Sequence, residues 1–285
     1  MASVRSNIMG EVHRLVGSRG DTPGFERPPG DDGILGADAV AWAVHGDFAT
    51  MMIGGVGALL LQMLHPAALA GVWDHSNFRR DMNGRLRRTA QFMAGTTFGS
   101  TAHADALIAK VRRIHDAVAG TLPDGTPYAA NDPATLTWVH VAGAASFLAA
   151  YRRYRNPLLS GAAQDRYYAE TAEIARRLGA TDVPTTRAAT AQYIRETRRI
   201  LRSDARSREV ARVIMASPAG TPAATAAGHL VLQAGVDLMP TWASAMHGLH
   251  VPALRRPLVR AGALGMGSVL RWALNGPREA VARPA

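Results

Sequence analysis

The strongest constraint on the fold of this chain is a helical pattern that begins near Leu35 and continues almost to the end. Alanine and leucine dominate this stretch, and runs of β-branched residues are short. Strict alternation of apolar and polar residues, which a half-buried strand requires, never persists. The pattern therefore argues against any sheet. We expect an all-α fold with a single large helical domain at residues 35–275.

Start and stop signals divide this domain into separate helices. Asp132 followed by Pro133 is typical of a helix start, because the acid caps the first turn and proline is tolerated at the first helical position. Gly179 with Pro184, and Pro218 in a Ser-Pro-Ala-Gly sequence, are typical of helix ends. The expected helices lie at residues 37–47, 48–70, 83–97, 101–119, 132–154, 161–178, 185–202, 205–216, 221–236, 239–247 and 251–273.

The two ends of the chain differ from the domain in composition. Residues 1–34 are rich in turn-forming residues and predict an irregular N-terminal arm. Residues 276–285 predict a frayed C-terminal tail. The arm contains no continuous apolar stretch long enough for a secretory signal, so we expect a cytoplasmic location.

The amino-acid composition limits the possible cofactors. Hydrophobic residues make up 47% of the chain and charged residues 19%, which is typical of a globular protein and not of a disordered one. There is no cysteine, and this excludes disulfides, zinc–thiolate sites, cysteine-ligated iron–sulfur clusters and a thiolate ligand to haem iron. Any metal must be held by histidine, carboxylate or tyrosine.

Charge and hydropathy favour a soluble protein without nucleic acid. The formal charge is +10, but the arginines are spread at helix-surface spacing and often lie near Asp or Glu, as on a solvated surface. The longest uncharged run, residues 48–73, is long enough to cross a bilayer, yet it contains Gln62, His65, Pro66 and four glycines. We therefore expect no nucleic acid, no stable membrane span, and a buried central helix at 48–70. The cluster Gly54-Gly55-Val56-Gly57 lacks the full dinucleotide fingerprint and favours close helix packing.

Two histidines occupy apolar helix faces and are candidate cofactor ligands. His115 should point into the core, and so should His140, whose small neighbours would leave space for a flat cofactor. A lone histidine on an apolar face is more often a satisfied core residue, and spacing alone does not choose between the two. The face of His115 carries Ile108, Val111 and Val118, and that of His140 carries Leu136, Gly143, Ala144 and Phe147.

A basic helix face precedes these histidines. Arg85, Arg88, Thr89 and Phe92 fall at i, i+3, i+4 and i+7, which places two cations and a hydroxyl together. Such a face suits an anion, for example the propionates of haem, or a polar oxygen species. The alternative is an exposed basic stripe without a ligand.

Polar residues also interrupt the long apolar segment. His65-Pro66 and the sequence Asp74-His75-Ser76 present polar groups where the chain emerges from the core. His65 is a candidate cofactor contact and His75 a candidate catalytic residue. The alternative for both is helix capping and turn formation.

The order of these features resembles the catalytic domain of the MpaB and rubber oxygenase family, over about residues 40–240. Each short pattern is unspecific alone, but their order and spacing together are fairly specific. The family includes the bacterial latex clearing protein, which cleaves polyisoprene double bonds oxidatively, and a fungal enzyme that shortens a prenyl side chain. The resemblance is carried by His65-Pro66, Gly71-Val-Trp-Asp-His75-Ser, Arg85-Leu-Arg-Arg88-Thr89, Val111-Arg-Arg-Ile-His115, Gly125-Thr-Pro-Tyr128-Ala, Asp132-Pro133 and Trp138-Val-His140.

This resemblance implies an all-α fold with a globin-like core that holds haem b (iron protoporphyrin IX). His115 matches the proximal axial histidine of the family, and Arg85 and Thr89 match its characteristic arginine and threonine near the haem. His140 falls at a second position of the family pattern, without an assigned role. Arg88 stands where latex clearing protein has a lysine that can approach the distal side of the iron. Arginine stays protonated and is a poor ligand, so distal gating by this residue is not expected.

The function implied is a haem b-dependent oxygenase that acts with O2 on a hydrophobic small molecule, such as an alkene or isoprenoid. Arg85, Arg88 and Thr89 would polarise O2 or anchor the propionates. This sequence has no glutamate at the place of the proposed catalytic base of latex clearing protein. Asp74 and His75 are the nearest replacements, so rubber is not the expected substrate. One alternative is a non-catalytic haem carrier or sensor. Another is a basic helical protein that binds a membrane surface or nucleic acid. A homodimer through the 251–273 helix is a further expectation.

Overall fold

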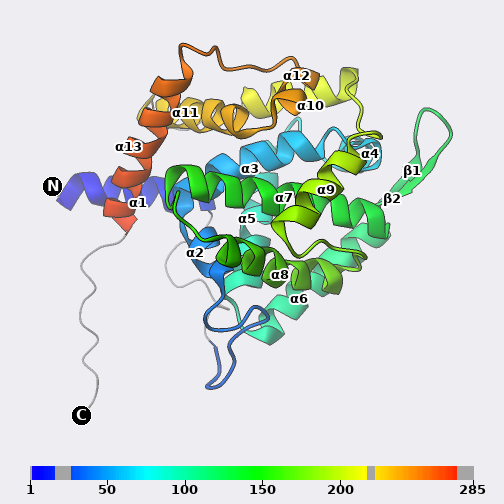
Figure 1. Cartoon of the computed structure of the whole chain (residues 1–285), viewed down its shortest axis with the longest axis horizontal. Helices are drawn as coiled ribbons and strands as arrows, with labels where there is room; N and C mark the ends of the chain where they lie inside the picture. Colours follow the sequence, from blue (N-terminus) through cyan, green and yellow to red (C-terminus); the bar gives the residue numbers. More distant parts are fainter. Residues whose placement is uncertain (1, 17–26, 217–221, 275–285) are drawn as a thin grey trace.

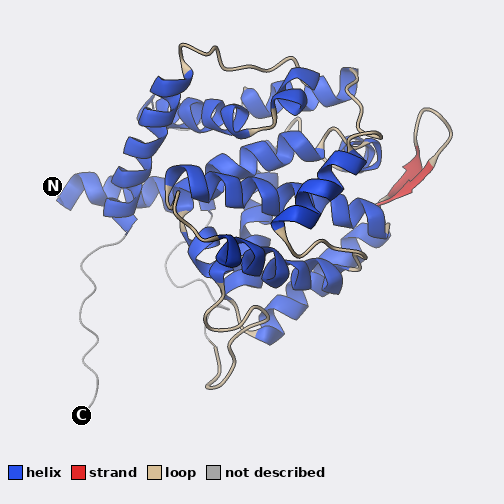
Figure 2. Ribbon diagram, viewed as in Figure 1, coloured by secondary structure: helices blue, strands red, loops and turns tan. Residues whose placement is uncertain are grey.

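The computed structural model describes residues 2–16, 27–216 and 222–274; about 70% of the structure is helical, and strands are almost absent from the described part (Figure 2). The all-α, single-domain prediction is confirmed; the globin-like character of the core stays a prediction. The elements are α1 Ala2–Val16, α2 Val40–Gly46, α3 Phe48–Gln62, α4 Pro66–His75, α5 Met82–Phe98, α6 Thr101–Asp116, β1 Ala119–Thr121, β2 Pro127–Ala129, α7 Pro133–Tyr154, α8 Gly161–Leu178, α9 Arg187–Thr197, α10 Ala205–Met215, α11 Pro222–Leu238, α12 Thr241–Met246 and α13 Arg256–Leu274.

Helices α3 and α7 form the centre of the molecule, with α11 packed on the outer side of α3 (Figure 1). The two central helices approach closely because glycine faces the contact: a Cβ built on Gly54 would lie 2.9 Å from the Cα of Phe147. A Cβ on Gly235 of α11 would lie 2.6 Å from the Cβ of Val56. The glycine cluster of α3 therefore serves helix packing, as the sequence predicted. Large side chains such as Trp138 and Leu60 are fully buried around it.

The predicted helix at 48–70 is in fact two helices, α3 and α4. The residue before a proline is disfavoured in the helical conformation, and His65 is accordingly extended, with φ −84° and ψ 123°. The His65 Nδ1 then accepts a long hydrogen bond of 3.5 Å from the amide of Ala68, which caps α4. The prediction that this apolar run is buried is confirmed, since Ile53, Leu60 and Leu64 are fully buried.

The N-terminal arm is not irregular throughout, because residues 2–16 form α1. Val4, Ile8 and Val12 recur every four residues, and Val12 is buried where α1 packs against α13 and α5. Arg5 Nε also donates a hydrogen bond of 3.0 Å to the carbonyl of Ala273. Packing against α13 and α5 thus stabilises a helix at residues 2–16. The apolar spacing of this stretch was overlooked because the residues that follow it are rich in turn formers. The predicted tail at 276–285 lies outside the described residues.

The prediction that the chain has no sheet is wrong for one short hairpin. β1 and β2 pair antiparallel, with Ala119 opposite Ala129, and project from the helical body (Figure 2). The loop contains Pro-Asp-Gly, in which Gly125 has φ +86° and the carboxylate of Asp124 accepts from the amide of Thr126 at 3.0 Å. Strands of three residues are too short for alternation to be recognised, so only the turn signal remained.

Helix α7 is long and apolar enough to cross a membrane, and α2 with α3 passes the same test only as a pair bent by 88°. In α7, 67% of the apolar window is buried inside the protein, as expected for the central helix of a folded core. Helix α13 has a more open apolar side, which includes Leu258, Leu264, Val269 and Trp272. Dimerisation through this helix stays a prediction.

Candidate functional site

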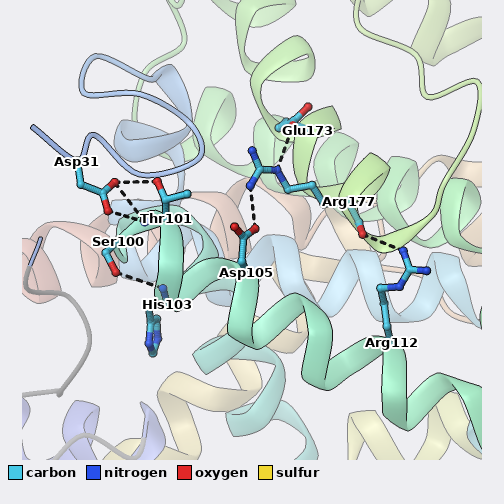
Figure 3. Close-up of polar contacts among 8 residues, drawn as sticks. All are labelled: Asp31, Ser100, Thr101, His103, Asp105, Arg112, Glu173 and Arg177. Carbon is cyan, nitrogen blue, oxygen red and sulfur yellow. Dashed lines mark hydrogen bonds and ion pairs between the residues drawn. The ribbon is translucent and has the colours of Figure 1, made fainter. Parts of the chain in front are cut away.

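Helix α6 carries His115 in its last turn, and its first turn is fixed by side chains (Figure 3). Ser100 Oγ accepts a hydrogen bond of 3.2 Å from the amide of His103. The carboxylate of Asp31 accepts from the amide and the hydroxyl of Thr101, at 2.9 and 2.8 Å. The Thr101 hydroxyl and the backbone amides hold the pKa of Asp31 below its ordinary value. The loop before α2 is thereby tied to the start of α6.

Ion pairs then hold α6 against α8 (Figure 3). Arg177 of α8 lies 2.7 Å from the carboxylate of Asp105 on α6 and 2.8 Å from that of Glu173 on its own helix. Arg112, one turn before His115, donates to the carbonyl of Arg177 at 3.2 Å. Each contact is partly exposed and contributes at most about 1 kcal/mol. Together they fix the last turn of α6 relative to the core.

His115 is half-buried, and its Nδ1 is buried without a hydrogen bond to any described residue. Burial lowers the pKa of His115, while the side chain of Asn131 and the charge of Asp116 act in the opposite direction. Arg85 lowers it further. A neutral imidazole with an available lone pair is the form that binds a metal. The sequence did not single out Asn131, which the structure places beside this ring.

Arg85 of α5 is the last of four influences on the pKa of His115, which its charge lowers. The arginine is half-buried, and burial followed by the charge of Arg88 lowers its own pKa. Within the described chain its guanidinium has no hydrogen bond and no ion pair. A partly desolvated, unpaired guanidinium is suited to bind a carboxylate in a bidentate manner.

Arg88 and Thr89 do not join this pair. The Arg88 side chain is 63% exposed, and its guanidinium lies 3.5 Å from the carboxylate of Asp81. Thr89 is also exposed, and its hydroxyl donates to the carbonyl of Arg85 at 3.2 Å. The exposed-stripe alternative therefore describes these two residues, and only Arg85 of the predicted basic face turns inward.

His140 lies in a second buried region, beside a histidine that the sequence analysis missed. His45 of α2 is buried and satisfied at both nitrogens, by the Thr97 hydroxyl at 2.8 Å and the Tyr167 hydroxyl at 3.0 Å. Burial lowers the pKa of His45 to about 3. Burial and the charge of Arg176 lower the pKa of His140 to about 4, and no described residue forms a hydrogen bond with its ring. The half-buried ring of His140 thus keeps free hydrogen-bonding capacity.

The remaining two candidates have local structural partners. His65 caps α4 and stacks on Trp138, with ring centroids 6.1 Å apart, and burial lowers its pKa to about 4. His75 is exposed, and its Nε2 lies 3.2 Å from the Tyr128 hydroxyl, which itself donates to Asp74 at 2.8 Å. Burial and Asp74 raise the pKa of Tyr128 to about 12. The capping alternative fits His65, and His75 belongs to a polar cluster at the base of the hairpin.

No three histidine or carboxylate side chains converge on a common point among residues 2–16, 27–216 and 222–274. A site in which the protein alone surrounds a metal is therefore not found there. Haem iron takes four nitrogen ligands from its porphyrin and needs one side chain from the protein. His115, whose Nδ1 has no hydrogen bond to a described residue, and His140 are the two candidates for such a side chain.

The comparison with family models identifies the domain to which these residues belong. The family model described as "ER-bound oxygenase mpaB/B'/Rubber oxygenase, catalytic domain" matches residues 42–272. This range includes the unpaired Arg85, His115 and His140. Comparisons with curated proteins and with solved structures gave no match. Because the family match covers most of the chain, the protein belongs to the MpaB and rubber oxygenase family and carries its oxygenase catalytic domain.

Proposed function

We propose that the protein is a haem b-dependent oxygenase in which His115 would hold the iron. The observation that carries the proposal is the half-buried imidazole of His115, whose Nδ1 has no hydrogen bond to a described residue, together with the half-buried, unpaired guanidinium of Arg85. A neutral imidazole is a good iron ligand, and a buried cation is a good partner for a propionate. The chain has no cysteine, so a thiolate ligand is not available.

Each residue then has a defined task. His115 would hold the cofactor through Nε2, because its Nδ1 is the buried nitrogen. Arg85 would neutralise and orient a propionate, which also compensates its own burial. His140, neutral at physiological pH, would offer one hydrogen bond without adding a charge. When bound, haem b would supply the redox chemistry on O2 that side chains cannot perform.

By analogy with the family, the proposed substrate class is a hydrophobic small molecule, such as an alkene or isoprenoid. Arg88 and Thr89 face solvent, so we assign them no contact with this substrate. His75 is held at the base of the hairpin by Tyr128 and would act, if at all, from the edge of the site.

The proposal is tested by haem content and O2 uptake. The full chain is purified from haem-supplemented cells, its haem is quantified, and O2 consumption is followed with a panel of apolar alkenes. We expect one haem per chain and substrate-dependent uptake that His115→Ala abolishes. The matched control is His75→Ala, which should retain haem. Haem without uptake on any alkene would favour the carrier or sensor alternative, and protein without haem would refute the proposal.

A further inference from the structure

The hairpin that the sequence analysis missed brings Asn131 back to the end of α6. After His115 the chain turns, and the amide of Val118 donates to the His115 carbonyl at 2.9 Å. The strands then pair, and the amide of Ala130 donates to the carbonyl of Val118 at 2.8 Å. The hairpin therefore closes on itself, and Asn131 follows it directly beside the last turn of α6.

The amide of Asn131 has a fixed orientation. Its Nδ2 donates to the carbonyl of Arg112 at 3.2 Å and to the carboxylate of Asp116 at 2.6 Å. Both partners accept and neither can donate, so the reverse orientation would set Oδ1 against two acceptors. The two N–H groups of the amide are thereby used, and Oδ1 is the group left to face elsewhere.

Two complementary atoms remain without partners at this point. Asn131 Oδ1 is buried and makes no hydrogen bond with any residue in the described ranges, and the same holds for His115 Nδ1. The two acceptors that hold the Asn131 amide, the Arg112 carbonyl and the Asp116 carboxylate, belong to the same end of α6 as His115, so the amide lies against the turn that carries this ring. A carbonyl oxygen can only accept, so a proton on Nδ1 would satisfy both buried atoms together.

We propose that Asn131 is a positioning residue for His115: its Oδ1 accepts the proton of Nδ1, which fixes the ring orientation and leaves the Nε2 lone pair for a ligand. The hydrogen bond on one ring nitrogen determines which nitrogen can bind a metal, and such outer partners orient metal-binding histidines generally. That Nε2 binds iron rests on the proposed function. The tautomer itself does not depend on the cofactor.

The first test measures the tautomer of His115 without any cofactor. The full chain is labelled with ¹⁵N-histidine and purified without added haem, and long-range ¹H–¹⁵N correlation spectra report which ring nitrogen carries the proton. His115→Gln assigns the signal by its loss. We expect the proton on Nδ1 in the wild type and its transfer to Nε2 in Asn131→Leu. A wild-type spectrum with the proton on Nε2 would overturn the proposal even if the variant fails to fold.

The second test uses the haem-loaded protein. Removing an outer-shell partner typically weakens metal binding about 10- to 100-fold, so Asn131→Leu should lose haem faster to an apomyoglobin trap by this order. The iron–histidine stretching band of the ferrous protein should move to lower frequency, because the ring donates less charge. Asn156→Leu, at the other end of α7, is the matched control and should change neither. If Asn131→Leu changes neither the band nor the rate of haem loss, the inference is overturned while the proposed function stands. If the wild type binds no haem, the proposed function is refuted, but the tautomer measured in the first test is unaffected.

Discussion

Two neighbouring glycines of α3, Gly54 and Gly55, should change the stability of the protein in opposite directions when each is replaced by alanine. A methyl group on Gly54 would meet the Cα of Phe147 at 2.9 Å and the carbonyl of Ser146 at 3.0 Å. Both are backbone atoms of the central helix α7 and can yield only if the two helices separate. A methyl group on Gly55 would meet the Cε1 of Phe147 at 3.9 Å, which is ordinary contact.

The expected magnitudes follow from these contacts. Overpacking costs about 1 to 3 kcal/mol, and alanine gains about 1 kcal/mol over glycine inside a helix. Gly54→Ala should therefore lower the free energy of unfolding by up to about 2 kcal/mol, while Gly55→Ala should raise it by about 0.5 to 1 kcal/mol. At about 2 to 4 °C per kcal/mol, Tm should fall for the first variant and rise slightly for the second.

Thermal unfolding followed by circular dichroism at 222 nm measures both variants against the wild type. The reasoning depends on the close contact of α3 with α7 at Gly54. If Gly54→Ala raises Tm as much as Gly55→Ala, the helices are further apart than the structure places them, and the account of the core is refuted.

Three further predictions follow from charges and histidines. The side chain of Asp237 is 2% exposed and pairs with Arg153, Arg256 and Arg260. Asp237→Asn should therefore destabilise the protein by about 1 to 2 kcal/mol after allowance for the exposed arginines, and an unchanged urea midpoint would contradict this. His45 is buried and neutral, with a pKa of about 3 against an ordinary 6.5, so its contribution to stability is complete above pH 6.5 and is lost as the pH falls towards 3. Tm should therefore fall from pH 7 to pH 5, and His45→Gln should flatten this slope by up to about 1.4 kcal/mol per pH unit. Arg85→Ala should weaken haem retention, whereas Arg88→Ala, on the exposed side of the same helix, should not; equal losses in an apomyoglobin competition would remove the special role of Arg85.

The helical class and most helix positions were predictable because they depend on local patterns. Asp132-Pro133 starts α7, and Gly179 ends α8 with φ +110°, as the sequence indicated. The break at His65-Pro66 was visible as a proline but was not given enough weight against a long apolar run. Helix α1 was missed because its amphipathic pattern is short and is completed by packing against α13.

The site was predictable only in part, for a different physical reason. The helical phase of His115 pointed it inward, and the family resemblance selected Arg85, whose charge lowers the pKa of that histidine. The sequence around Asn131 gives no sign of its role beyond its position before a helix start. Its proximity to the end of α6 depends on closure of the hairpin. His45 sits on a helix of seven residues, too short for a periodic face, and its partners come from α5 and α8. Contacts between distant segments are what a single sequence does not display.

The most direct test of the central claim is the visible spectrum of three proteins purified from haem-replete cells: the wild type, His115→Ala and His140→Ala. The account predicts a Soret band in the wild type and in His140→Ala, its loss in His115→Ala, and its partial return when imidazole is added to His115→Ala. A wild type without a Soret band, or a band that survives His115→Ala and disappears with His140→Ala, would contradict the assignment of His115 as the iron ligand.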